Sequence, residues 1–180
     1  MNVFTIGHST RPLADFVAAL RAAQVECVVD VRRFPRSRRH PHFNGNALEA
    51  ALQRANILYR HMPELGGRRA ARTDRASPHT LWREAAFRNY ADYAESAEFR
   101  AAFEALLALA RAHTVAIMCA EAVWWRCHRR VIADYLIAAG ATVTHIFDAG
   151  KTEPARLTPG AVKRDDGTLL YAADQAALPL

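Results

Sequence analysis

The sequence predicts an α/β fold, a three-layer domain with a mainly parallel sheet of about five strands. Two observations predict this class. Short apolar runs typical of buried strands alternate along the chain with longer segments whose apolar residues recur at helical spacing. The chain has 180 residues, of which 51% are hydrophobic, enough to bury one core. We therefore expect a single α/β domain over residues 1–180, with residues 151–180 as its peripheral C-terminal extension.

The predicted elements follow one another with short connections. Strands are expected at 3–6, 26–31, 57–62, 114–119 and 142–147. Helices are expected within 7–23, 46–55, 81–94, 98–112 and 126–140. The tail from Lys151 onward is rich in Pro and Gly, and in it only GTLLYA (167–172) has an extended pattern. We expect this tail to form a small hairpin or a peripheral strap.

Short polar residues mark the predicted starts of helices. Ser9 or Thr10 is expected to cap the first helix and Asn46 the second, because their side chains can accept hydrogen bonds from free N–H groups. Pro12 suits a first helical turn, and Gly140 is expected to end the last helix. Residues 63–80 show no periodic apolar pattern, and loops of that length are commonly functional or mobile.

The charge of the chain favours anionic partners. The formal net charge is +6, and arginines cluster in RRFPRSRR (32–39) and GGRRAARTDR (66–75). Phosphate-bearing small molecules or nucleic acids are the partners that this predicts. The alternative is a compositional bias, because arginine supplies 22 of the 24 basic residues and would then be abundant without any role in binding.

The expected compartment is the cytoplasm. The sequence lacks an apolar run of the roughly 20 residues needed to cross a bilayer, and it does not begin with a basic segment followed by an apolar stretch. Its three cysteines, Cys27, Cys119 and Cys127, are an odd number at irregular spacing. We expect them to be reduced thiols, with Cys27 in the core.

Polar residues follow each predicted strand at its carboxyl end, where ligands bind in open parallel sheets. The first strand leads to His8 and Ser9, and the second ends at Asp30 and Arg32. The fourth strand leads to Cys119 and Glu121. The alternative is that loops are polar for reasons unrelated to function, but the recurrence at every strand favours one site at this edge.

The start of the last predicted helix adds a second group of candidates. Its apolar stripe, extended back one turn, directs Cys127 and His128 toward the sheet. The helix N-terminus would lower the pKa of a cysteine there. Arg130 is spaced to pair with Asp134, so Arg129 is the better anion ligand of the two.

Several chemistries can be compared with this pattern. A cysteine phosphatase needs five residues between thiolate and arginine, whereas six separate Cys119 from Arg126, and the loop has no glycine. A G-x-S-x-G nucleophile elbow is missing. Acid/base catalysis by Asp30 and Glu121 in an arginine-lined pocket is the chemistry that remains. For Asp30, an ion pair with Arg32 or Arg33 explains the sequence equally well.

Two other functions stay open. Zinc could bind Cys119, Cys127, His128 and His8, although no paired C-x-x-C or H-x-x-x-H spacing supports it. A nucleic-acid binding module without catalysis would use RRFPRSRRHPHF (32–43), with Phe34 and Phe43 for stacking. Trp124 and Trp125 are adjacent and are not expected to face the same way, so one of them should pack on the core or on a partner.

Five motifs resemble the bacterial and archaeal family of domain of unknown function 488. They are TIGHST, VDVRRFPRSRRHPHFN, YRHMPELGGRR, FRNYADY and MCAEAVWWRCHRRVIADYL. The resemblance implies a compact Rossmann-like α/β domain whose recurring positions include Gly7, His8, Asp30, Arg32, Gly66, Gly67, Cys119, Glu121, Cys127, His128 and Arg129. It implies no activity. AVWW (122–125) departs from the polar, proline-containing segment of many relatives, so the tryptophans are not catalytic candidates.

The sequence thus predicts an enzyme acting on a nucleotide, nucleic acid or other phosphate-bearing substrate, by hydrolysis or glycosidic-bond chemistry. No cofactor or metal is expected, with zinc as the alternative. The candidate catalytic residues are His8, Asp30, Cys119, Glu121, Cys127 and His128. The candidate anion-binding residues are Ser9, Arg32, Arg36 and Arg129.

Overall fold

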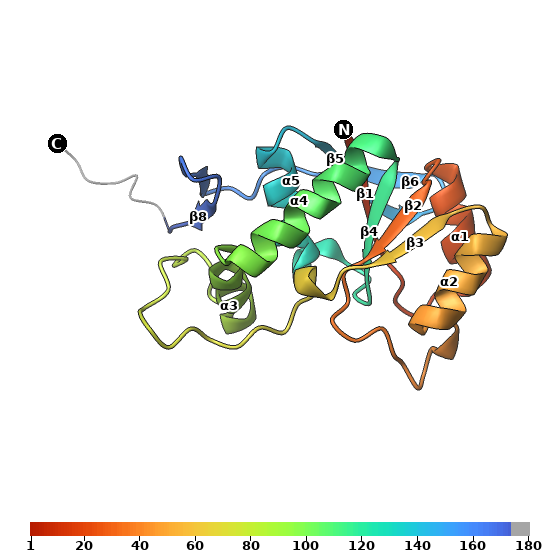
Figure 1. Ribbon diagram of the computed structural model, residues 1–180, viewed down its shortest axis with the longest axis horizontal. Helices are drawn as coiled ribbons and strands as arrows, with labels where there is room; N and C mark the ends of the chain where they lie inside the picture. The colour runs from red at the N-terminus through yellow and green to blue at the C-terminus, as the bar shows by residue number, and fades with distance from the viewer. Residues whose placement is uncertain (174–180) are drawn as a thin grey trace.

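The central sheet of the computed structural model has six strands in the order β3-β2-β4-β1-β5-β6, and the structure describes residues 1–173 (Figure 1). The five strands predicted from the sequence are all present and run parallel, and β6 joins the edge antiparallel to β5. The strands are β1 (Asn2–Gly7), β2 (Cys27–Asp30), β3 (Leu58–His61), β4 (Val115–Cys119), β5 (Thr142–Asp148) and β6 (Lys151–Pro154).

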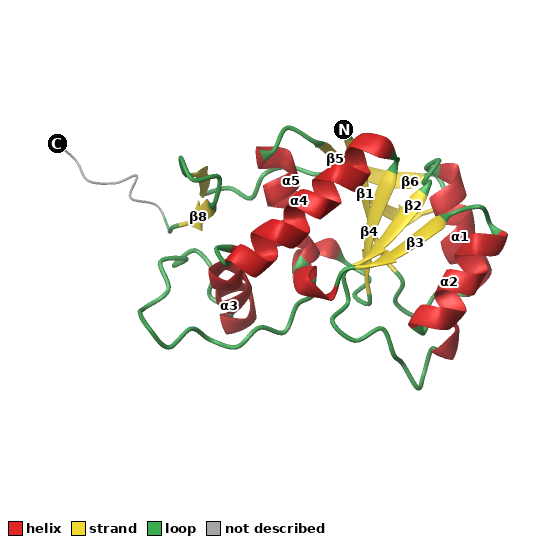
Figure 2. Ribbon diagram, viewed as in Figure 1, coloured by secondary structure: helices red, strands yellow, loops and turns green. Residues whose placement is uncertain are grey.

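Helices cover both faces of the sheet, so the predicted three-layer Rossmann-like fold is confirmed (Figure 2). On one face, α1 (Leu13–Ala22) and α2 (Gly45–Arg54) bury one apolar cluster against the sheet. On the other, α3 (Ala85–Ala94), α4 (Ala97–Ala112) and α5 (Arg129–Ala138) bury a larger one. None of the helices in residues 1–173 has the length and apolar character of a membrane span.

Side-chain alternation along the strands determines which candidates can meet. Ile117 and Cys119 point toward α4 and α5, whereas Met118 between them points toward α1 and α2. Asp30 is paired in register with Met118 and so lies on the α1/α2 face. At the carboxyl edge of the sheet, the Cys119 thiol and the Asp30 carboxylate therefore lie on opposite faces.

Two predicted helix caps are wrong. The first helix begins at Leu13 after Pro12, without a side-chain cap. The chain must instead turn over the end of β1, where Ser9 adopts a positive φ of 47° and its N–H donates to the Ala120 carbonyl. The second helix begins at Gly45 rather than after Asn46.

The predicted pair of Arg130 and Asp134 is also wrong. Asp134 is buried and accepts hydrogen bonds from the Thr158 N–H and the Tyr171 hydroxyl, so the tail occupies its oxygens. Arg130 donates to the Thr158 side chain and lies over the Trp82 ring.

The C-terminal extension is more regular than the sequence predicts. Besides the expected extended segment, which is β8 (Leu169–Tyr171), it contributes β6 and β7 (Ala161–Lys163). β7 and β8 form the expected small hairpin, which packs near α5 through the buried side chains of Leu169 and Tyr171. Residues 174–180 of the predicted extension lie outside the described range.

Candidate functional site

A cavity of about 620 Å³ opens at the carboxyl edge of the sheet, and we call it the basic pocket. Its lining contains five arginines against two glutamates, so it favours an anionic occupant. The charged and thiol groups that line it are Arg32, Arg33, Arg36, Arg68, Arg126, Glu84, Glu121, Cys119 and Cys127. Its histidines are His8, His40 and His128.

Two cysteines lie together at the floor of this pocket. The Sγ atoms of Cys119, at the end of β4, and Cys127, just before α5, are 3.3 Å apart. Their exposed fractions are 2% and 6%. The positions are set by backbone contacts: the His8 N–H donates to the Cys119 carbonyl, and the Cys127 N–H donates to the Trp124 carbonyl.

Arg129 is the counterion of this pair. It is 1% exposed, and its Nε donates to the sulfurs of Cys119 at 3.0 Å and Cys127 at 3.2 Å. Its Nη2 donates to the Glu121 carbonyl at 2.6 Å, and its Nη1 to the Thr5 hydroxyl at 3.4 Å. Arg129 therefore faces two sulfurs of the protein itself, and it does not line the basic pocket.

The surroundings of the two thiols separate their pKa values. The hydrogen bond from the Cys119 thiol, with the charge of Arg129, lowers the pKa of Cys127 from 9.0 to about 6. Burial raises the pKa of Cys119 well above its ordinary value. These surroundings favour the thiolate on Cys127 and the proton on Cys119.

Asp30 and Arg32 form the ion pair that the sequence offered as an alternative. Asp30 is fully buried and accepts hydrogen bonds from Arg32 Nε and Nη2, the latter at 2.6 Å, and from the Tyr59 hydroxyl. Arg32 Nη2 also donates to the Phe43 carbonyl. Arg32 lines the basic pocket and Asp30 does not, so the carboxylate fixes the guanidinium from behind.

His8 connects this ion pair to the pocket. Its Nδ1 lies 2.9 Å from the Ser9 carbonyl, which only accepts, and its Nε2 lies 3.2 Å from Arg32 Nη1, which only donates. The ring is therefore the neutral Nδ1–H tautomer. Burial lowers the pKa of His8 to about 4, which agrees with this state. Its face stacks on Phe43 with ring centroids 4.3 Å apart.

His128 lies on the opposite wall. Its Nε2 donates to the Val31 carbonyl at 3.0 Å, and burial lowers its pKa to about 4. A side chain at Gly67 would place a Cβ only 2.8 Å from Nδ1 of His128. The glycine lets the 66–68 segment lie directly against the imidazole and brings Arg68 to the rim.

Glu121 contributes to the pocket in two ways. Its side chain is exposed at the rim, and its main chain passes over the end of β1. A Cβ at Gly7 would lie 1.8 Å from the Glu121 carbonyl oxygen, so only glycine permits this approach. The carbonyl is thereby held where Arg129 can donate to it.

The structure brings most of the predicted site residues to one pocket. His8, Ser9, Arg32, Arg36, Cys119, Glu121, Cys127 and His128 line it. Arg129 lies beneath it, and Asp30 behind Arg32. The sequence reasoning did not name Arg68 or Thr5 as site residues. The arginine cluster at 66–75 was the available signal for Arg68, and no signal in the sequence pointed to Thr5.

The residues of the zinc hypothesis line one pocket but do not form a group of metal ligands. Within residues 1–173, no three or more His, Cys, Asp or Glu side chains are grouped as metal ligands. Cys119 and Cys127 share a cationic partner, Arg129, and the Nε2 of His128 donates to a carbonyl. Each of these contacts opposes binding of a cation by the set.

The two tryptophans divide as predicted. Trp124 is partly buried and stacks on His145 with centroids 4.3 Å apart, whereas Trp125 is 45% exposed. Their rings are perpendicular. The stacked pair covers the side of the site where His145 meets the Thr5 hydroxyl at 2.7 Å.

Titration of the thiols is the direct check of this geometry. We expect one thiolate to appear with a midpoint near pH 6, measured by ultraviolet absorbance and by the pH dependence of alkylation. Cys119→Ala should raise that midpoint because the donor to Cys127 is lost, and Cys119→Ser, which keeps a donor, should raise it less. An unchanged midpoint in Cys119→Ala would contradict the assigned pairing.

Comparison with known proteins gives one match. The family model described as domain of unknown function DUF488 matches residues 12–136, more than half of the chain and including both cysteines of the site. No curated protein and no solved structure matches. By the extent of the family match, the chain belongs to the family of domain of unknown function DUF488.

Proposed function

We propose that the protein is an enzyme that uses Cys127 as a nucleophile on a phosphate-bearing substrate of nucleotide size. The observation that carries this proposal is the Cys127 sulfur, which accepts a hydrogen bond from the buried Arg129 at the floor of an arginine-rimmed pocket. A thiolate is the reactive form of cysteine, and a pKa near 6 keeps it populated at neutral pH.

The arginines at the rim of the basic pocket bind the substrate and take no part in bond breaking. A volume of about 620 Å³ is within the range of small-molecule sites. Arg36 and Arg68 are exposed at this rim, free to approach a phosphate. Arg32 is held from behind by Asp30 and presents Nη1 beside His8.

In this proposal the phosphate group serves only to bind the substrate, and the thiolate attacks another electrophilic centre of the substrate. The loop from Cys119 to Cys127 does not form a phosphate cradle, because its N–H groups at Arg126 and Cys127 donate to carbonyls of the same loop. The N–H of Glu121 donates to the Cys119 sulfur. Glycosidic-bond chemistry on a nucleotide or sugar phosphate fits such an arrangement, with Glu121 as the acid/base group at the rim.

Binding and turnover test the two halves of the proposal separately. Calorimetric titration with adenosine diphosphate should give an affinity that falls about tenfold in the double variant Arg36→Ala/Arg68→Ala, since each exposed charge pair contributes roughly 0.2–1 kcal/mol. Arg111→Ala, on α4 away from the pocket, is the matched control. Equal affinity in all three proteins would contradict the assigned rim.

Turnover should depend on Cys127. Any substrate found in a screen of nucleotides and sugar phosphates should be left intact by Cys127→Ser, while adenosine diphosphate still binds. Full activity of that variant would remove the nucleophile from the mechanism.

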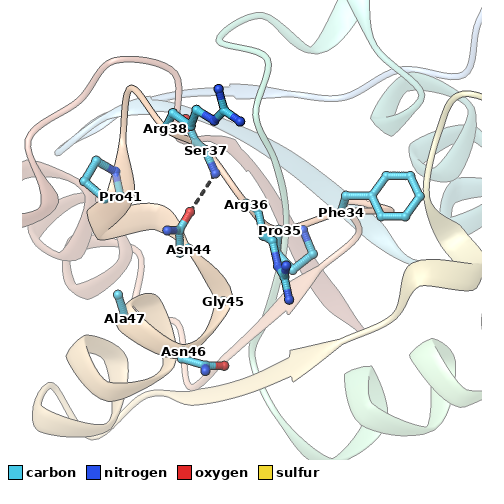
Figure 3. A pocket seen from close by; sticks show the side chains of 10 residues that line it. All are labelled: Phe34, Pro35, Arg36, Ser37, Arg38, Pro41, Asn44, Gly45, Asn46 and Ala47. Atoms are coloured by element: carbon cyan, nitrogen blue, oxygen red, sulfur yellow. Dashed lines mark hydrogen bonds between the residues drawn. The ribbon is translucent and has the colours of Figure 1, made fainter.

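A second candidate function is binding of single-stranded nucleic acid by the 32–43 loop. Phe34 is 68% exposed, with the Arg33 guanidinium 5.6 Å from its ring centroid. The loop also borders a second cavity, of about 1230 Å³, shown in Figure 3, where Phe34 extends away from the other labelled side chains. The prediction that Phe43 stacks on bases is wrong, because its side chain is fully buried against His8.

The salt dependence of oligonucleotide binding tests this second function. Affinity for a labelled oligothymidylate should fall linearly with salt on logarithmic axes, because arginines displace counterions from phosphates. Phe34→Ala should weaken binding about tenfold, since stacking of one base contributes roughly 1–3 kcal/mol. Val162→Ala, which also removes an exposed apolar side chain (56% exposed), is the control. Absence of binding at low salt would eliminate the function.

A further inference from the structure

The two cysteines of the pocket floor are arranged for chemistry with each other. Their sulfurs are 3.3 Å apart, and one is a donor and the other an acceptor in the same hydrogen bond. The third cysteine, Cys27, is fully buried inside β2 and does not line the basic pocket. The structure thus separates one structural thiol from a paired dithiol.

We propose that Cys119 and Cys127 form a peroxide-reactive dithiol that closes reversibly to a disulfide in the floor of the basic pocket. This modification site shares Cys127 with the proposed catalytic role but does not depend on it. The contacts that carry it are the sulfur–sulfur approach and the shared Nε donor of Arg129.

The reaction balances with a hydroperoxide as the oxidant. The Cys127 thiolate attacks one oxygen of hydrogen peroxide, the O–O bond breaks, and Cys127 becomes a sulfenic acid as hydroxide leaves. The Cys119 thiol then attacks the Cys127 sulfur, an S–S bond forms and the S–O bond breaks. The thiol proton leaves with the sulfenic oxygen as water, so two thiol sulfurs are oxidised and one peroxide is reduced.

The geometry assigns the two roles. Cys127 has the larger exposure of the pair and the lowered pKa, so it meets the oxidant first. Cys119 keeps its proton and lies within reach as the resolving thiol. Because the two cysteine residues are only 2% and 6% exposed, a small peroxide has access where a bulky disulfide has little.

Closure requires a small movement. A disulfide bond is about 2.05 Å long, so the sulfurs must approach by roughly 1.2 Å. Cys119 is fixed by the parallel pairing of β4 with β1 at Gly7. Cys127 follows the short 3-10 helix η3 (Trp124–Arg126) and precedes α5, so its segment is the one that we expect to shift.

Oxidation removes the thiolate that Arg129 neutralises. Arg129 then retains only its contacts to the Glu121 and Ala122 carbonyls and to Thr5. The oxidised protein therefore has neither a nucleophile nor a compensated charge at the pocket floor, and reduction by a thiol restores both.

Mass spectrometry of the full chain tests the proposal. The reduced protein, treated with equimolar hydrogen peroxide, should lose about 2 Da, yield a peptide pair joined through Cys119 and Cys127, and regain its mass with dithiothreitol. Cys27→Ala should behave in the same way. Wild-type protein that gains oxygen or stays unchanged, without this cross-link, would overturn the proposal.

Two variants assign the roles. Cys119→Ser should accumulate a sulfenic acid at Cys127, captured by dimedone, and Cys127→Ser should give neither adduct nor cross-link. Dimedone capture at Cys119 instead would overturn the assignment. None of these readouts needs a substrate. A protein that forms the disulfide but turns over nothing refutes the proposed function alone, and one whose turnover needs Cys127 without forming the disulfide refutes this proposal alone.

Discussion

Arg129→Met is expected to lower the free energy of unfolding by about 3–5 kcal/mol at pH 8.5, the cost of removing one partner of a buried ion pair. The arginine is 1% exposed and donates to two sulfurs, to the Glu121 carbonyl and to Thr5. Methionine fills similar volume but leaves the Cys127 thiolate without a counterion. Urea denaturation of both proteins gives the difference.

The pH dependence distinguishes the charge effect from lost packing. The pKa of Cys127 is depressed in the folded state, from 9.0 to about 6, so its ionisation stabilises the fold fully above pH 9. That contribution declines as the pH falls and is lost below about 6. The difference between wild type and Arg129→Met should therefore shrink markedly at pH 5.5.

A matched background completes this experiment. In Cys127→Ser no thiolate forms at this position, so Arg129→Met should cost nearly the same at both pH values. Burial lowers the pKa values of His8, His128 and His145 to about 4, so the fold weakens as the pH falls from 6.5 to 4. The charge of Arg129 adds to this lowering at His128 and His145, and Arg129→Met in the Cys127→Ser background measures that share separately. An equal loss at pH 8.5 and 5.5 with Cys127 present would show that Arg129 acts through packing alone.

Asp30→Asn is expected to destabilise the protein by about 3 kcal/mol or more. Asp30 is fully buried and accepts hydrogen bonds from Arg32 and Tyr59 on both oxygens. An amide has only one acceptor oxygen, and its NH₂ group would face a donor. The Arg32 charge would then be buried without its counterion. Urea denaturation measures the loss.

The double variant Asp30→Asn/Arg32→Gln reveals the coupling. It should be more stable than the sum of the two single changes predicts, because each single change leaves a buried charge unpaired. Additive losses would contradict the ion pair. Adenosine diphosphate binding should weaken in Asp30→Asn because the carboxylate positions Arg32. An unchanged affinity in folded protein would show that the ion pair does not affect binding in the pocket.

The alternation of apolar strands and amphipathic helices determined the fold class of this protein. Four of the five predicted parallel strands bury residues such as Val29 or Ile117 between two layers of helices, whereas β3 at the edge is largely exposed. The sequence also determined that His8, Cys119 and Cys127 meet at the carboxyl edge, because parallel strands all end there. Those inferences use local periodicity and the geometry of a parallel sheet.

Other parts of the site depended on register and on long-range contacts. The parallel register sends Asp30 to the α1/α2 face and Cys119 to the α5 face, so the carboxylate pairs with Arg32 instead of joining the thiols. Arg130 and Asp134 have helical spacing for an ion pair, but the C-terminal tail satisfies Asp134 first. The sequence by itself determined which residues gather at this edge. Only the tertiary structure decided their partners, because burial makes each buried polar group take the nearest complementary group, whatever its distance along the chain.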